Sequence, residues 1–131
     1  MILPLSQSVP LHYLDFDYSE DAEGAGTFEA MASTQAAQAG HIRQEITRVL
    51  NWAHSTFSGM RAPLDEGGEW DFDLQGQQEW SAIEALTYDE IAGQLTARLD
   101  EPRAPRHSVT LSLTGSPQFC EAFRMQFCPD Q

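Results

Sequence analysis

Apolar and polar residues alternate in several stretches of this chain, which is the pattern of β-strands that bury one face. In residues 11–18 the apolar side chains fall on one side and two aspartates on the other, and residues 70–75 (WDFDLQ) repeat this arrangement. Polar residues and two glycines follow the first stretch and predict a hairpin to a second strand at about 28–32. Glu29 shares the polar side of that second strand.

Three further strands are predicted in the second half of the chain. The stretches AIEALTYD (82–89) and QLTARLD (94–100) are separated by a turn that contains Gly93. A proline-rich connection, EPRAPR, then leads to residues 108–113, where valine and leucine alternate with serine and threonine.

Helical spacing of apolar residues appears twice. From about Gln35 to Phe57 the apolar residues recur every three or four positions, with Ser33 or Thr34 available as the N-cap and Gly59 at the end. A second helix is predicted from Ser116, because serine followed by proline is a favourable helix start, and it ends before Pro129.

The resulting order, ββαββββα, lacks the regular strand-helix-strand alternation of parallel α/β folds. We therefore expect an α+β protein with an antiparallel sheet of about five to six strands and both helices on one face. All 131 residues are predicted to form one domain, with residues 1–10 as an extended or flexible segment.

If the helices cover the apolar side of this sheet, the other side carries a concentration of acidic residues. The residues expected there are Asp15, Asp17, Glu29, Asp71 and Asp73. Antiparallel sheets commonly leave one face in solvent, so the repeated Asp-Phe-Asp motif is consistent with a solvated or protein-binding face.

The overall charge narrows the choice of partners. Twenty acidic residues against seven basic ones give a net charge of −13 and a pI of about 4.4. Such a field repels phosphate backbones and anionic lipids, so we expect no binding to nucleic acid or membranes, whereas a basic protein remains a possible partner. The N-terminus lacks the features of a signal peptide, which predicts a cytoplasmic location.

Clustered aspartates also suggest an alternative, a divalent-metal site. If the strands at 11–18 and 70–75 were close, Asp15, Asp17, Asp71 and Asp73 could hold Mg²⁺ or Ca²⁺ and support a metal-dependent hydrolase. The stretch DFDYSEDAEGAG is not an EF-hand, because Glu20 stands where glycine is required and Gly26 where a bidentate glutamate is required.

No motif for catalysis or cofactor binding is present. The chain has no HExxH, no nucleophile elbow and no phosphate-binding glycine pattern. Cys120 and Cys128 lie eight residues apart on a predicted helix, about 12 Å along its axis, which is too far for a disulfide. Trp52 and Trp80 fall outside the clear apolar stripes and are candidate anchors at a binding surface.

The leading hypothesis from the sequence is therefore a non-catalytic interaction or accessory protein, such as an inhibitor, an immunity-type protein or an adaptor. Its acidic sheet face, together with Trp52 and Trp80, would bind a basic partner without a cofactor. The metal-dependent hydrolase and a purely structural domain remain the alternatives.

Overall fold

The computed structural model describes residues 11–128, so the predicted extended segment at residues 1–10 lies outside the described residues. The elements follow the expected order: β1 (Asp17–Glu20), β2 (Gly26–Gln35), α1 (Ala36–Thr56), the short 3-10 helix η1 (Leu64–Glu66), β3 (Trp70–Glu79), β4 (Glu84–Asp89), β5 (Gln94–Leu99), β6 (Arg106–Gly115) and α2 (Pro117–Phe127). No helix in this part of the chain is long and apolar enough to cross a bilayer.

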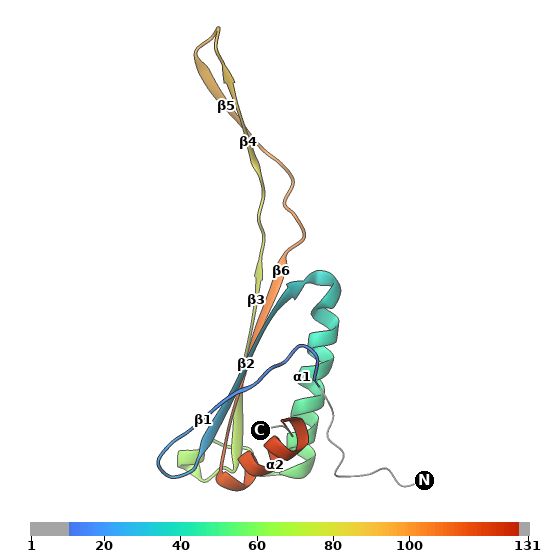
Figure 1. Ribbon diagram of the computed structural model, residues 1–131, viewed down its shortest axis with the longest axis vertical. Helices are drawn as coiled ribbons and strands as arrows, with labels where there is room; N and C mark the ends of the chain where they lie inside the picture. The colour runs from blue at the N-terminus through green and yellow to red at the C-terminus, as the bar shows by residue number, and fades with distance from the viewer. Residues whose placement is uncertain (1–10, 129–131) are drawn as a thin grey trace, which may run out of the picture.

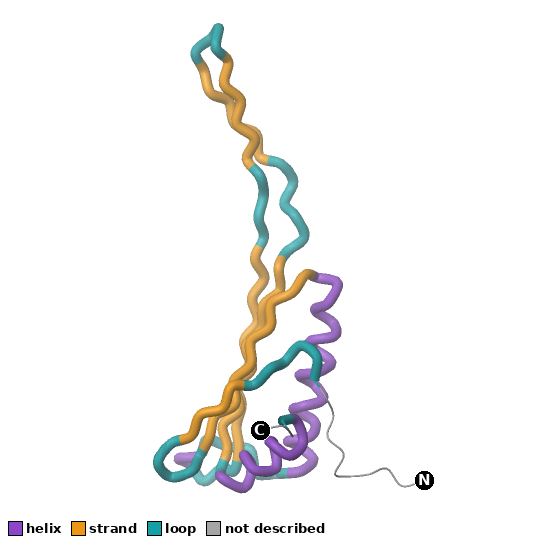
Figure 2. The backbone as a smooth tube through the Cα atoms, viewed as in Figure 1, coloured by secondary structure: helices purple, strands orange, loops and turns teal. Residues whose placement is uncertain are grey.

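Four of the strands form an antiparallel sheet in the order β1-β2-β6-β3, and α1 and α2 pack on the same side of it (Figure 1). The α+β prediction and the placement of both helices are thus confirmed. The six strands do not all join one sheet, however. β4 and β5 pair with each other as a separate two-stranded ribbon, which projects far from the helices (Figure 2).

The core lies between the four-stranded sheet and the two helices. Trp70 of β3 and Phe119 of α2 are fully buried and stack with their ring planes 3° apart and their centroids 5.7 Å apart. The phenylalanines of the two Asp-Phe-Asp motifs face this core, as the alternation predicted. Phe16 is buried and meets Phe123 edge-on at 5.1 Å, whereas Phe72 is only partly buried.

The two helices begin differently. Ser116 caps α2 as predicted, since its side chain accepts a hydrogen bond from the backbone N–H of Phe119. The predicted cap of α1 is wrong, because Ser33 and Thr34 belong to β2 and the N-cap is Gln35, which makes no side-chain cap hydrogen bond. β2 stays paired with β6 up to Gln35, so the chain passes directly from strand to helix.

The first predicted strand is also shorter than expected. Residues 11–16 belong to no strand and bend at His12 and Tyr13, and β1 begins only at Asp17. The carboxylate of Glu45, buried on α1, accepts hydrogen bonds from the backbone N–H groups of His12, Tyr13 and Leu14 at 2.7–3.1 Å. The backbone donors of this stretch are therefore satisfied by a helix side chain instead of a neighbouring strand.

The chain runs outward through β3 and then β4, and it returns through β5 and then β6. Together these strands form the two legs of one long antiparallel ribbon, in which β4 and β5 are the outer part. Trp70 lies opposite Gly115 at its base, and Asp89 lies opposite Gln94 near its tip. The predicted turn at Gly93 closes the ribbon, with φ of +65° at the glycine and two backbone N–H groups bonded to the Asp89 carboxylate. We call β4, β5 and this turn (residues 84–99) the arm.

A candidate binding face on the open side of the sheet

The side of the four-stranded sheet opposite the helices, which we call the open face, carries the acidic residues in register. Strand pairing places Asp17 beside Glu29, Glu29 beside Ser112, and Ser112 beside Asp73. These residues form a row that crosses all four strands, because partners in an antiparallel pair point to the same side. The sequence prediction that Asp17, Glu29 and Asp73 share one face is confirmed by this register.

Hydroxyl groups of β6 run through the middle of the open face. Ser112 donates a hydrogen bond to a Glu29 carboxylate oxygen at 3.2 Å, and Gln75 donates to Asp73 at 3.2 Å. Within residues 11–128, Asp17, Glu29 and Asp73 form no ion pair. Their negative charges are therefore not neutralised by neighbouring arginines.

Asp71 lies in the next row, beside Thr114, and differs from the other acids of this face. Its Oδ1 forms an ion pair of 3.0 Å with Nε of Arg61 and also accepts the backbone N–H of Phe72. The guanidinium of Arg61 lies 4.5 Å from the centroid of the Phe72 ring. Asp71 is thus engaged with its own chain at the edge of the open face.

Asp15 is exposed but precedes β1, and so it does not belong to the row. Its charge instead acts on Cys128 at the end of α2, where burial first and Asp15 second raise the pKa of the thiol. β2 and β6 lie between β1 and β3, so the closeness of these two strands that a shared metal site would require is not present.

The spacing of the acids disfavours a shared cation. Adjacent strands are about 4.8 Å apart, which places Asp73 about 10 Å from Glu29 and about 14 Å from Asp17. Among residues 11–128, no group of three or more histidine, cysteine, aspartate or glutamate side chains is arranged to hold a metal ion. The carboxylates are spread along the sheet instead of enclosing a point.

Met31 adds an apolar contact to this acidic face. It lies on β2, two residues after Glu29 and beside Thr110 of β6, and 70% of its surface is exposed. The alternation of residues 28–32 puts Met31 on the same side as Glu29, but charge alone does not identify a methionine as a binding residue. An unbranched thioether suits a binding surface because it adapts to the shape of its partner.

The two candidate tryptophans lie in different environments. Trp52 is half-buried among the rings of Phe57, Phe119 and Phe127, with centroids 5.4–6.2 Å apart, so its ring belongs to the core. Trp80 is 61% exposed and follows β3 at the root of the arm. Of the two, only Trp80 presents its ring to solvent.

The two cysteines are free, as their spacing predicted. Burial raises the pKa of the Cys120 thiol, whose sulfur lies 3.5 Å from the carbonyl oxygen of Gly115. Nearby, burial and a hydrogen bond to Glu20 raise the pKa of Tyr18. Cys120 belongs to the buried core and Cys128 packs against it partly buried, and a raised pKa is the reverse of what a nucleophilic cysteine needs.

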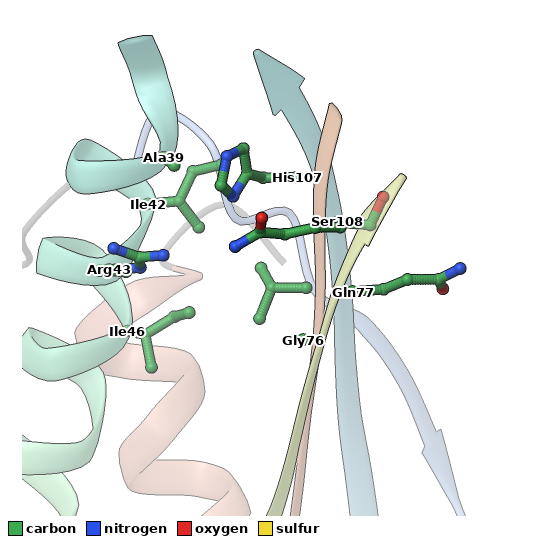
Figure 3. Close-up of a pocket in the computed structure, with 10 residues that line it drawn as sticks. Ala39, Ile42, Arg43, Ile46, Gly76, Gln77, His107 and Ser108 are labelled. Carbon is green, nitrogen blue, oxygen red and sulfur yellow. The ribbon is translucent and has the colours of Figure 1, made fainter. Parts of the chain in front are cut away.

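A small cleft of about 220 Å³ separates the first half of α1 from the upper parts of β3 and β6 (Figure 3). Ile42 and Ile46 form its helix wall, Gly76 lies on the strand side, and Arg43 and His107 also line it. Gly76 leaves the cleft open, since no atom lies within 4 Å of the position that a Cβ would occupy. The cleft lies on the helix side of the sheet and is separate from the open face.

Comparison of the chain with protein-family models found no matching family, and searches of curated proteins and of solved structures found no significant match.

Proposed function

We propose that the protein is a non-catalytic protein-binding protein whose open face binds a basic partner. The observation that carries this proposal is the row of Asp17, Glu29 and Asp73, which crosses the sheet in register. Within the described chain, these three carboxylates form no ion pair with a basic side chain. The row lies on a face that neither helix covers (Figure 1).

Two physical properties of this face support the proposal. A net charge of −13 accelerates encounter with a positively charged protein, and the row concentrates part of that charge on a rigid sheet. The exposed Met31 and the hydroxyl groups of Ser112 and Thr110 then supply short-range contacts next to the charges. Charge for encounter and a mixed polar and apolar surface for docking are the usual components of a protein interface.

The alternative of a metal-dependent hydrolase receives less support from the same residues. Asp15 lies outside the row and Asp71 is paired with Arg61, so only Asp17 and Asp73 of the four suggested ligands remain on the open face without an ion pair in the described chain. These two are separated by two intervening strands.

Affinity capture with charge-matched variants tests the proposal. The face variant carries Asp17→Asn, Glu29→Gln and Asp73→Asn, and the control variant carries Asp21→Asn, Glu23→Gln and Glu90→Gln in loops. Each substitution set removes three acids and changes the net charge from −13 to −10. Immobilised wild type and control are expected to recover the same basic protein at low salt, and the face variant is expected to lose it.

Recovery must also decrease as salt increases, because added ions screen exposed charges beyond about 10 Å at 0.1 M and beyond about 3 Å at 1 M. If the face variant and the control recovered a basic protein equally well, net charge alone would account for binding and the proposed face would be wrong.

A further inference from the structure

The arm has one apolar face and one polar face. Strand pairing places Leu86 beside Ala97, Tyr88 beside Leu95, and Leu99 beside Glu84 on one side. The other side carries Ala85, Thr87, Asp89, Gln94, Thr96 and Arg98. The leucines and the tyrosine of the first side are 58–68% exposed, and Ile91 in the turn is completely exposed.

The apolar residues of the arm follow the same alternation as the core-facing residues of β3 and β6. In the first leg of the ribbon, buried Trp70 and exposed Leu86 and Tyr88 all occupy even-numbered positions. In the second leg, the buried leucines of β6 and the exposed leucines of β5 all occupy odd-numbered positions. The sequence thus keeps the pattern of a covered sheet over a region that neither helix reaches (Figure 1).

A two-stranded ribbon is marginally stable in water by itself and gains stability when its apolar face packs on another layer. The arm pairs with no other strand of the described chain and lies away from both helices (Figures 1 and 2). Its exposed apolar side chains amount to about 500–700 Å², which is at or above the largest apolar patch of a typical monomer, and such patches are often functional. Such a surface is typical of an interface.

We infer that the arm is a dimerisation element, in which its apolar face packs against the same face of a second copy of this chain. Two such faces would bury somewhat more than 1,000 Å² in total, which is at the lower end of specific interfaces. The apolar face is suited to self-association, because its only charged residue, Glu84, lies at its root and its centre carries Leu86, Tyr88 and Leu95. A two-fold arrangement needs only one such self-complementary surface.

The charge of the protein determines the relative direction of the two arms. Parallel arms would bring the acidic tips, each with Asp89 and Glu90, and the two bodies of a −13 protein close together. Antiparallel arms place the bodies at opposite ends of a six-residue strand, which is about 20 Å long and exceeds a Debye length of about 8 Å at physiological salt. The dimer is therefore antiparallel.

Molar mass measured across a concentration series of the full chain tests this inference. At about 100 µM the wild type is expected to have twice the 14.6 kDa mass of one chain and to dissociate on dilution, since interfaces at the low end of the size range are typical of weak, reversible complexes. The double variant Leu86→Thr and Leu95→Thr keeps strand-forming residues and is expected to raise the dimer Kd about a hundredfold, because symmetry removes four leucines from one interface.

The matched control is Thr87→Ser with Thr96→Ser on the polar face of the same two strands, which is expected to leave the dimer Kd within about twofold of wild type. Far-UV circular dichroism and melting temperature verify that the body remains folded in each variant. Two results would overturn the inference: a wild type that stays monomeric at about 100 µM, or a dimer that is unaffected by the double leucine variant. An arm that binds a different protein would give the first result.

The dependence of binding on salt distinguishes the arm dimer from a complex through the open face. Because the arm interface is apolar and the bodies repel, the dimer is expected to persist or tighten from about 0.1 to about 1 M salt, whereas a complex through the open face weakens. Loss of partner capture with an intact dimer would reject only the proposed function, and the reverse result would reject only the dimer.

Discussion

The carboxylate of Glu45, on the buried side of α1, accepts a hydrogen bond of 3.1 Å from the backbone N–H of Leu14. The same carboxylate accepts the N–H groups of His12 and Tyr13. One side chain therefore holds the segment that leads into β1 and its Asp17, so the position of one end of the acidic row depends on a helix residue 28 positions away in the sequence.

Replacing Glu45 tests this attachment. Glu45→Ala leaves three backbone donors without their acceptor and is expected to lower the free energy of unfolding by about 2–4 kcal/mol. Backbone amide exchange at residues 12–14 should accelerate at the same time. Gln44→Ala, at an exposed neighbouring position, serves as the control. Unchanged exchange at residues 12–14 in the Glu45 variant would contradict this role.

Alanine substitutions at two glycines are expected to change the stability of the protein in opposite directions. A Cβ at Gly115 would overlap the ring of Phe119, which is stacked on Trp70 and cannot move away, so Gly115→Ala should destabilise the protein by about 1–3 kcal/mol. Gly40 is exposed on α1, and outside the helix's own backbone no atom lies within 4 Å of the position of a Cβ there, so Gly40→Ala should stabilise the protein by about 0.5–1 kcal/mol. Denaturant midpoints measure both, and equal effects of the two substitutions would refute the packing described around Phe119.

The cleft beside α1 predicts a stabilising substitution. Gly76 has no positive φ, and no atom lies within 4 Å of the position of a Cβ there, so valine gains strand propensity and apolar contact with the cleft wall. Gly76→Val is expected to raise the free energy of unfolding by about 0.5–1.5 kcal/mol, as measured by chemical denaturation. A loss of stability would show that the cleft has no room for the side chain.

The raised pKa values of the two cysteines predict how thiol reactivity and protein stability depend on pH. Burial raises the pKa of both thiols, so each stays protonated and should react with iodoacetamide more slowly at neutral pH than a free cysteine. A raised thiol pKa stabilises the native state below the unfolded-state pKa, and this contribution is lost as the pH rises through the folded-state value. Stability should therefore fall in alkaline solution, above the ordinary thiol range.

Replacing Asp15 separates the effect of its charge on the pKa of Cys128 from the effect of burial. Because the charge of Asp15 helps raise the pKa of Cys128, Asp15→Asn should accelerate alkylation of Cys128 by about two- to threefold near pH 8. Asp17→Asn, which removes a charge from the open face, is the control. A rate that responds equally to both substitutions would assign the effect to net charge.

Much of the fold could be predicted from local patterns. The start of α2 at Ser116, the turn at Gly93 and the inward direction of Phe16 and Phe72 follow from capping, turn chemistry and alternation, all of which depend on neighbouring residues. The open face could be predicted for the same reason, because alternation alone placed Glu29 and Asp73 on the side opposite Phe28 and Phe72.

The parts that could not be predicted depend on residues far apart in the sequence. Alternation at residues 11–16 is equally compatible with a paired strand and with an unpaired segment held by Glu45, and only the tertiary structure distinguishes them. Likewise, the alternation of β4 and β5 indicates that each strand has an apolar side but does not specify which layer covers it. Alternation also does not specify a strand neighbour for Asp15, which precedes β1 and has no strand partner.

Carboxyl footprinting of the complex with the recovered basic partner tests the open-face proposal most directly. Carbodiimide labelling of each acid is compared between the free protein and the complex. We expect labelling of Asp17, Glu29 and Asp73 to fall severalfold on binding, while Asp21, Glu23 and Glu90 change little. If the open-face acids were labelled equally in both states and protection appeared elsewhere, the open face would not be the binding surface.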